Sequence, residues 1–284
     1  MRRSTVLIWG HLGAPALGVA GSGYASAINQ WLIVAGLVLC IRRLPGLKSL
    51  GNVFAARRIE LAEILRLGLP IGGIMGIELG LFLAAGILIG LLGAAALGAH
   101  QLVLSCASIS FMVPLGLSQA ATVRVAYERG AGRAVAARRA GLVAIVLGIG
   151  FMSAAAVVFW TFPVAIVAAY VDTADPANRA LVEIARRLLA IAAIFQVFDG
   201  MQTIAAGALR GHRDTFVPML LAATGYWGAG FLGGWIFAFP LGYGAVGLWW
   251  GLALGLAVVA ALLTLRLHQL ASPRRQVGTA AATP

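Results

Sequence analysis

From Leu79 to Val123 the chain runs for 45 residues without a single Asp, Glu, Lys or Arg. Such a run is too apolar for the surface of a water-soluble domain and too long for one membrane-spanning helix, which needs about 20 residues. Gly90, Gly93 and Gly98 divide it, so we expect two spanning helices joined by a turn. The composition agrees, because 61% of the 284 residues are apolar and 11% are charged, against roughly 25% charged in soluble domains. These features exclude nearly every class of cytosolic enzyme.

The same reasoning gives seven apolar segments long enough to span a membrane. A second uncharged run, Thr215–Leu265, is divided at residues 240–244, Pro-Leu-Gly-Tyr-Gly. We therefore predict an all-α integral membrane protein, a polytopic bundle of about seven transmembrane helices in contact with the lipid bilayer. The predicted spans are Ala16–Ile41, Leu67–Gly90, Gly98–Val123, Ala140–Trp160, Leu188–Leu209, Phe216–Phe239 and Ala245–Leu265.

Basic residues predict the orientation of these spans. If the spans alternate, sixteen arginines and lysines fall on one side of the membrane, and only Arg179, Arg186 and Arg187 fall on the other side beyond the first few residues of the chain. The positive-inside rule makes the sixteen-residue side cytoplasmic, together with the C-terminus. We expect a multi-pass protein of the bacterial inner (plasma) membrane. The net charge of +12 then reflects topology, and no nucleic-acid partner is expected.

The first residues do not fit this pattern. Thr5–Gly10 is apolar but too short to span. A signal peptide is one alternative, because residues 25–27, Ala-Ser-Ala, resemble a cleavage site, but His11 and Pro15 interrupt the apolar core that such a peptide needs. We expect instead the stub of an incomplete helix in a chain truncated at its front.

Two acidic residues lie deep inside predicted spans. Glu78 follows Arg66 by twelve residues and Asp199 precedes Arg210 by eleven, which places both carboxylates about 17–18 Å from the cytoplasmic ends of their helices. The hydrocarbon core is about 30 Å thick, so both lie near its middle at nearly the same depth. Each costs about 2.5–3.5 kcal/mol on insertion scales, and carboxylates at this depth usually serve ion or substrate pathways. The alternative is that each is neutralised and packs the bundle.

Polar residues accompany the two carboxylates. Gln196, Thr203 and Arg210 recur at helical spacing and form a stripe that cannot face lipid. On the second span Glu78 points away from a ridge of small residues, Gly72, Gly76 and Gly80, which we expect to pack closely against another helix. A cavity between spans would let the carboxylates bind Na⁺, exchange a proton or hold a cationic substrate. Its candidate lining residues are Gln101, Ser105, Gln196, Gln202 and Thr203.

No catalytic pattern accompanies this cavity. The sequence contains no HExxH, GxSxG, P-loop or paired CxxC motif, and Cys40 and Cys106 lie in apolar runs with no metal-site spacing. We expect no enzyme activity and no cofactor, apart from Na⁺ or H⁺ as a coupling ion.

The chain resembles the C-terminal portion of a MATE (multidrug and toxic compound extrusion) transporter of the NorM type. The resemblance runs from about Val6 to Leu270, and its matching strings occur in the family's order and spacing. The strings are Gly68–Pro70, Ala99–Gln101, Met112–Val125, Gly130–Gly132 and Phe195–Gly211.

The resemblance implies a domain organisation, because the family fold has twelve helices in two six-helix lobes. Residues 1–41 would end the N-terminal lobe, as a stub of helix five followed by helix six, and residues 42–66 would form the cytoplasmic link. Residues 67–271 would form the C-terminal six-helix lobe, and residues 272–284 a disordered cytoplasmic tail. The partner would be the missing N-terminal lobe or a second copy of the chain.

The resemblance also implies an activity. A Glu and an Asp at the positions of Glu78 and Asp199 form the family's C-terminal-lobe cation site, and inward Na⁺ or H⁺ drives multidrug efflux, the antiport of organic cations and other xenobiotics. Cation binding would shift the second and third spans and release the drug outward. This chain departs from the pattern at Phe195, where some relatives have a Tyr, and at Ala126, where Gly is usual. Because Phe195 lacks the phenol oxygen of that Tyr, H⁺ remains a candidate coupling ion beside Na⁺.

Two alternatives remain. A lipid-linked sugar flippase of the same superfamily would carry more basic residues facing its cavity. An inactive or non-transporting membrane fragment would show no coupling through Glu78 and Asp199.

Overall fold

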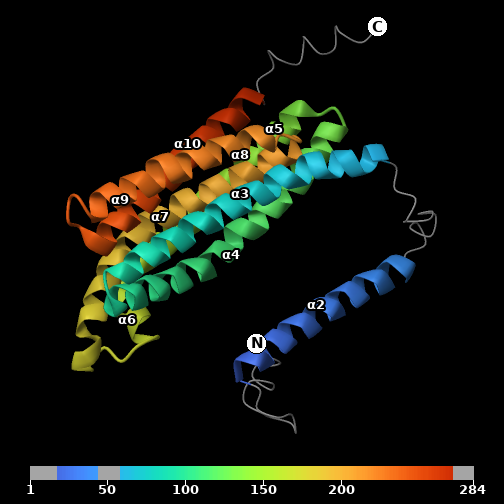
Figure 1. The fold of residues 1–284 in the computed structure, drawn as a ribbon. Coiled ribbons are helices and arrows are strands. Elements are labelled where there is room, and N and C mark those ends of the chain that lie inside the picture. Colours follow the sequence, from blue (N-terminus) through green and yellow to red (C-terminus); the bar gives the residue numbers. More distant parts are fainter. Residues whose placement is uncertain (1–17, 44–57, 271–284) are drawn as a thin grey trace. The chain divides into compact units, whose positions relative to one another are not determined.

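The computed structural model describes residues 18–43 and 58–270 of the chain. Every regular element in these two ranges is a helix, as expected for an all-α protein (Figure 1). The chain divides into two compact parts, residues 1–62 and 63–284, which we describe separately. The predicted stub at Thr5–Gly10 and the predicted tail at 272–284 lie outside the described residues.

The first part contains helix α2, Gly18–Arg43. Its large apolar side chains, among them Trp31 and Leu37, are exposed. A helix that is apolar on all sides suits a membrane environment. Arg42 and Arg43 lie in the last turn, where positive charge is favourable beside the carbonyl ends of the helix.

The second part is a helical bundle. The boundary between the two parts falls at Ala62–Glu63, inside the predicted link 42–66, and the last residues of that link are already helical because α3 begins at Arg58. The helices are α3 (Arg58–Leu91), α4 (Ala94–Gly130), α5 (Ala134–Thr161), α6 (Pro163–Ala168), the short 3₁₀ helix η2 (Pro176–Asn178), α7 (Arg179–Gly211), α8 (Phe216–Ala223), η3 (Thr224–Leu232), α9 (Gly233–Ala238) and α10 (Gly244–Leu270).

Helix α7 lies at the centre of this bundle and packs against α4, α5 and α10. Small residues allow the close approach: a Cβ added at Gly207 would overlap the hydroxyl and carbonyl oxygen of Ser118 on α4, and one at Gly200 would fall 2.8 Å from the Met152 side chain on α5. Most residues in the second half of α7 are therefore buried, including its polar ones.

The segment α8–η3–α9 forms one span that is not a regular α-helix. Its middle, η3, is a π-helix, whose backbone turns are wider than those of the flanking α-helices. Helix α10 packs against it through Gly247, Gly251 and Gly255, where an added Cβ would overlap the backbone of the neighbouring segment. At these three glycines the backbone of α10 lies close to the backbone of η3 and α9.

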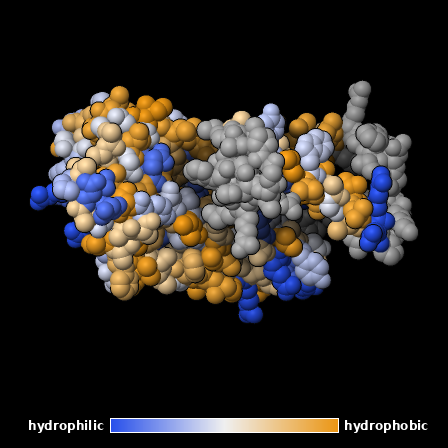
Figure 2. Space-filling view, turned by 90° about the horizontal axis from the view of Figure 1, so that it is seen from below, coloured by the Kyte–Doolittle hydropathy of each residue, from blue (hydrophilic) through white to orange (hydrophobic). Residues whose placement is uncertain are grey.

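The structure is consistent with a membrane protein. Six helices in the described part of the chain are long and apolar enough to cross a membrane: Gly23–Cys40, Leu61–Leu91, Ala94–Gly130, Ala134–Thr161, Phe216–Ala238 and Gly244–Leu270. The seventh expected span, Leu188–Leu209, is helical but belongs to the buried central helix α7 and is not one of these six. Figure 2 shows apolar residues over much of the visible surface, which suits lipid contact.

One sequence interpretation needs correction. Gly72 and Gly76 do not form a packing ridge, because within the described residues nothing lies within 4 Å of an added Cβ at either position. Of the three glycines only Gly80 touches a neighbouring helix, through the Trp227 ring at 3.4 Å. Helical spacing of small residues predicts that close packing is possible but does not predict which helix, if any, uses it.

Candidate cation site

The Glu78 carboxylate lies half-buried on α3 at a pocket between α3, α4 and α7 with a volume of about 410 Å³. Most of the lining is apolar, and Glu78 and Arg210 are its charged members. The lining residues are Ile71, Ile74, Met75, Glu78, Leu79, Phe82, Ser108, Phe111, Leu115, Gln202, Thr203, Ala206 and Arg210. The pocket thus combines apolar walls with one carboxylate and one guanidinium.

The structure brings Glu78 and Asp199 together through Gln202. The Gln202 Nε2 group donates hydrogen bonds to the Glu78 carboxylate on α3 and to the Asp199 carboxylate on α7, each at 3.3 Å. The two accepting oxygens are therefore no further apart than twice that distance. Asp199 is only 8% exposed, so two carboxylates from different helices share one buried amide.

Thr203 extends this polar cluster toward the C-terminal end of α7. Gln202 Nε2 also lies 3.0 Å from its hydroxyl oxygen, so the two amide hydrogens are shared among three acceptors, and the Thr203 carbonyl accepts a hydrogen bond from the Ser118 hydroxyl of α4 at 2.8 Å. Arg210 donates to the same Ser118 oxygen at 2.9 Å. Because the Nε of Arg210 is buried without a partner in the described chain, the guanidinium is held by a single side chain.

The other candidate lining residues lie elsewhere. Gln196 is buried and accepts a hydrogen bond from the Ser110 hydroxyl at 2.8 Å, outside the pocket lining. Gln101 and Ser105 are exposed on α4, where the Ser105 hydroxyl donates to the Gln101 carbonyl at 2.8 Å. Of the five candidates, Gln202 and Thr203 line the pocket that contains Glu78.

Phe195, one turn before Asp199, places no oxygen at the site. Its ring is buried and packs edge-on against Phe82 and Trp249, with ring centroids 6.1 and 5.4 Å apart. Trp249 in turn donates its indole N–H to Nδ1 of His100 at 3.2 Å, and both residues are fully buried.

Tyr226 is a buried polar residue that the sequence analysis did not single out. Its side chain is fully buried on η3, and its hydroxyl has no hydrogen-bond partner among the described residues. The π-helix that carries it cannot be recognised from hydropathy, and the surrounding segment has only the apolar composition of a spanning helix. No sequence signal separated this tyrosine from Tyr243.

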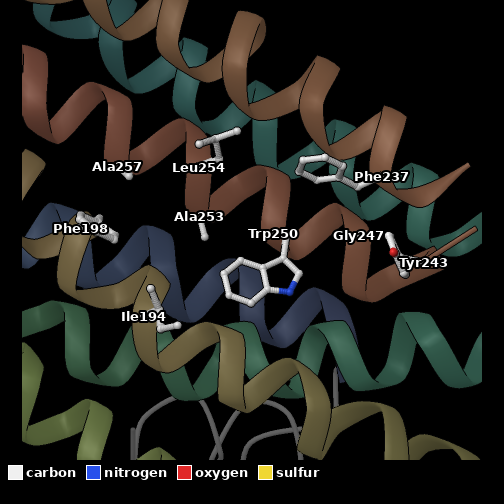
Figure 3. Close-up of a pocket in the computed structure, with 9 residues that line it drawn as sticks. All are labelled: Ile194, Phe198, Phe237, Tyr243, Gly247, Trp250, Ala253, Leu254 and Ala257. Carbon is white, nitrogen blue, oxygen red and sulfur yellow. The ribbon is translucent and has the colours of Figure 1, made fainter. Parts of the chain in front are cut away.

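A second hollow lies between α7, α9 and α10, with a volume of about 470 Å³ (Figure 3). Figure 3 shows Trp250 at the centre of this apolar groove. It contains no charged residue and is lined by Ile194, Phe198, Phe237, Tyr243, Gly247, Trp250, Ala253, Leu254 and Ala257.

The Glu78 pocket offers hard oxygen donors from several elements. Carboxylates, an amide and hydroxyls suit a metal cation such as Na⁺, and carboxylates alone suit a proton. No group of three or more His, Cys, Asp or Glu side chains that could hold a metal occurs within residues 18–43 and 58–270. Any metal cation here would depend on neutral oxygens beside the two carboxylates.

Comparisons with known proteins identify relatives of the chain. The family model MatE matches residues 70–236. The multidrug resistance protein NorM of Burkholderia vietnamiensis is 49% identical over 262 residues, which cover 92% of this chain and 57% of that protein. The probable multidrug resistance protein NorM of Burkholderia mallei is 50% identical over 266 residues, which cover 93% of this chain and 56% of that protein.

A solved structure shares the fold. The crystal structure of the eukaryotic MATE transporter AtDTX14 superposes with a TM-score of 0.80 at 22% identity, over 96% of this chain and 61% of that chain. The chain thus spans a little over half the length of the NorM proteins it matches. Because the family model matches more than half of its residues, the chain belongs to the MatE family.

Proposed function

We propose that the chain is part of a multidrug exporter that moves organic cations out of the cell by antiport with Na⁺ or H⁺. The observation that carries the proposal is the single buried amide of Gln202, which bridges Glu78 on α3 and Asp199 on α7. Two buried carboxylates at mid-membrane depth with an amide N–H₂ between them form a place that a cation can take over. The names of the NorM relatives support export of drugs.

The proposed mechanism is competition for the carboxylates. A cation that enters between Glu78 and Asp199 takes the place of the Gln202 amide hydrogens and holds α3 to α7. The positive group of a bound drug needs the same Glu78 carboxylate in the apolar pocket, so the coupling ion displaces it. We expect one cation at a time, because two cations side by side in a low-dielectric site repel each other strongly.

We further propose that a second lobe completes the cavity. The NorM relatives are nearly twice as long as the region that this chain matches. A pocket open on one side needs an opposing wall to alternate between the two faces of the membrane. The exporter would lie in the bacterial inner membrane with the C-terminus of this chain in the cytoplasm, following its sixteen basic residues on one side.

The experiment is drug efflux from cells that lack their own efflux pumps and express the complete polypeptide that carries this chain. Glu78→Gln and Asp199→Asn keep the shape of each side chain and remove its charge. We expect each to abolish ethidium efflux at unchanged membrane expression. Glu183→Gln is the matched control, because it removes an exposed carboxylate from the same helix as Asp199 and should leave efflux intact. Normal efflux in both site variants would rule out the proposed coupling.

A further inference from the structure

A groove between α4 and α5 has charged residues at one end and apolar walls along the rest. Its volume is about 440 Å³, and its lining comes from these two helices, which pack against each other. Arg124 and Glu128 of α4 and Arg139 of α5 lie toward the end where the two helices are joined. The rest of the lining consists of Ala, Val and Leu side chains. The groove is therefore polar at one end and apolar beyond it.

The groove lies on a different face of α4 from the Glu78 pocket. Ser108 and Leu115 of α4 line that pocket, whereas Leu117 lines the groove. Leu117 follows Leu115 by two residues, and at 3.6 residues per turn the two side chains point about 200° apart. The second lobe proposed above would close the Glu78 pocket from the other face of α4, which leaves the groove open to lipid.

The length of the groove corresponds to one leaflet of a bilayer. Leu117 and Glu128, its two ends on α4, are eleven residues apart, and so are Ala136 and Leu147 on α5. Eleven residues of helix span about 16–17 Å, and half of a hydrocarbon core of about 30 Å is about 15 Å. Both helices are long and apolar enough to cross a membrane. The apolar walls therefore lie beside the acyl chains of one leaflet, and the charged end lies at its headgroups.

Arginines outnumber carboxylates at the charged end. Glu128 is buried, and its two oxygens contact Arg124 at 2.7 Å and Arg133 at 2.6 Å. The side chains of both arginines are more than half exposed, so each keeps N–H groups that a ligand can reach. Arg139 is exposed, and none of the ion pairs among the described residues includes it. Three guanidinium groups and one carboxylate leave net positive charge for an anion.

Tyr127 lies beside this charged end. Its ring is 62% exposed, and the guanidinium carbons of Arg124 and Arg133 lie 5.8 and 5.5 Å from its centre. Tyrosines are enriched where a membrane meets water, because the ring is apolar and the hydroxyl is polar. Guanidinium groups at that level can donate paired hydrogen bonds to the oxygens of a phosphate.

We propose that this groove binds an anionic phospholipid, with its phosphate at Arg124 and Arg139 and one acyl chain along Leu117, Val143 and Leu147. Basic pockets between membrane helices suit anionic headgroups, and the apolar walls favour a lipid over a soluble anion. A lipid in this position contacts both helices and stabilises their packing. The inference does not depend on drug export, because it concerns a different face of the bundle.

Lipid-dependent stabilisation of the complete polypeptide that carries this chain, purified in detergent, tests the assignment. Thermal unfolding is recorded while phosphatidylglycerol is added, and phosphatidylcholine with the same acyl chains is the zwitterionic comparison. A ligand that binds only the folded state raises the melting temperature with its concentration. We expect phosphatidylglycerol to stabilise the wild type more than phosphatidylcholine does. Arg124→Gln combined with Arg139→Gln should need about tenfold more phosphatidylglycerol for the same stabilisation.

Matched variants separate the groove from a general effect of charge. Arg179→Gln combined with Arg186→Gln removes two exposed arginines near the start of α7, at the opposite end of the bundle, and should leave the response to phosphatidylglycerol unchanged. Arg139→Gln alone breaks no ion pair among the described residues and should already weaken the response. Ala120→Phe adds a ring at an exposed position of the groove lining. It should weaken the response although every arginine is kept.

The lipid assignment is overturned if both lipids stabilise the wild type equally, or if Arg124→Gln combined with Arg139→Gln responds to phosphatidylglycerol as the wild type does. Soluble glycerol 1-phosphate distinguishes a lipid from a free phosphate group. Equal stabilisation by glycerol 1-phosphate and phosphatidylglycerol, with no effect of Ala120→Phe, would show a site for a small anion and would also overturn the assignment. Ethidium efflux is measured separately, so failure of the lipid site leaves the proposed antiport untouched.

Discussion

The amide nitrogen of Gln202 on α7 lies 3.3 Å from the carboxylate of Glu78 on α3, although 124 positions separate them in the chain. This contact joins a helix at the side of the bundle to its buried central helix. It gives the Glu78 carboxylate a hydrogen-bond donor in the membrane interior, where an unpaired polar group is costly.

Gln202→Met should destabilise the chain. The substitution keeps the length of the side chain but removes the amide group whose two hydrogens are shared among Glu78, Asp199 and the Thr203 hydroxyl, so Glu78 and Asp199 lose their shared partner. We expect a loss of about 1–3 kcal/mol in the free energy of unfolding, measured by denaturation in detergent micelles. Gln101→Met, on the exposed face of α4, is the control. Equal stability of the two variants would show that the Gln202 bridge contributes nothing.

Gly207→Ala should destabilise the contact between α4 and α7. The new methyl group would overlap the hydroxyl and backbone carbonyl of Ser118, which cannot move without shifting α4. We expect a loss of about 1–3 kcal/mol. Gly150→Ala is the matched control, because nothing in the described chain lies within 4 Å of the added Cβ, and helix propensity favours Ala by up to about 1 kcal/mol. A Gly207→Ala melting temperature at or above that of Gly150→Ala would contradict this packing.

Trp249→Phe should be more damaging than Trp250→Phe, although the two tryptophans are adjacent. Trp249 is fully buried and donates to His100, whereas Trp250 is 44% exposed in the apolar groove. We expect about 1–3 kcal/mol for Trp249→Phe and less than about 1 kcal/mol for Trp250→Phe. Thermal unfolding of the two variants side by side measures the difference, and the reverse order would exclude a core role for Trp249.

Thiol labelling should report the proposed orientation. In a chain with Cys40 and Cys106 replaced by Ala, a cysteine at Ala174 lies in the loop before α7 and one at Ala131 lies between α4 and α5. We expect a membrane-impermeant maleimide to label the Ala174 position in intact cells and the Ala131 position only after the membrane is opened. Labelling with the opposite pattern would place the sixteen basic residues outside the cell.

Much of the fold could be predicted from hydropathy. In the described part of the chain, each of the seven expected spans overlaps a helical segment over most of its length, because about 20 apolar residues in a membrane must satisfy their own backbone hydrogen bonds. The observed helices extend beyond the predicted spans; α3, for example, begins at Arg58 where Leu67 was expected. The predicted spans were ended at charged residues, whereas the observed helices continue past such residues.

The candidate site could be predicted only in part. The depths of Glu78 and Asp199 followed from helical rise, and the structure places both on the Gln202 amide. The burial of Tyr226 could not be predicted, because its position depends on the π-helix and on the packing of η3 against α3 and α10. The prediction that Gly72, Gly76 and Gly80 form a packing ridge was wrong for a related reason, because the spacing of residues in a sequence does not show which helix surfaces meet.

The most direct test of the account is ethidium movement in proteoliposomes that contain the complete polypeptide with this chain. A Na⁺ gradient or a pH gradient is imposed, and ethidium transport against its own gradient is recorded for wild type, Glu78→Gln, Asp199→Asn and the control Glu183→Gln. We predict transport driven by the Na⁺ gradient or by the pH gradient in wild type and in Glu183→Gln, and none in the two site variants. Ethidium transport that persists in both Glu78→Gln and Asp199→Asn would contradict the claim that these carboxylates couple cation entry to drug export.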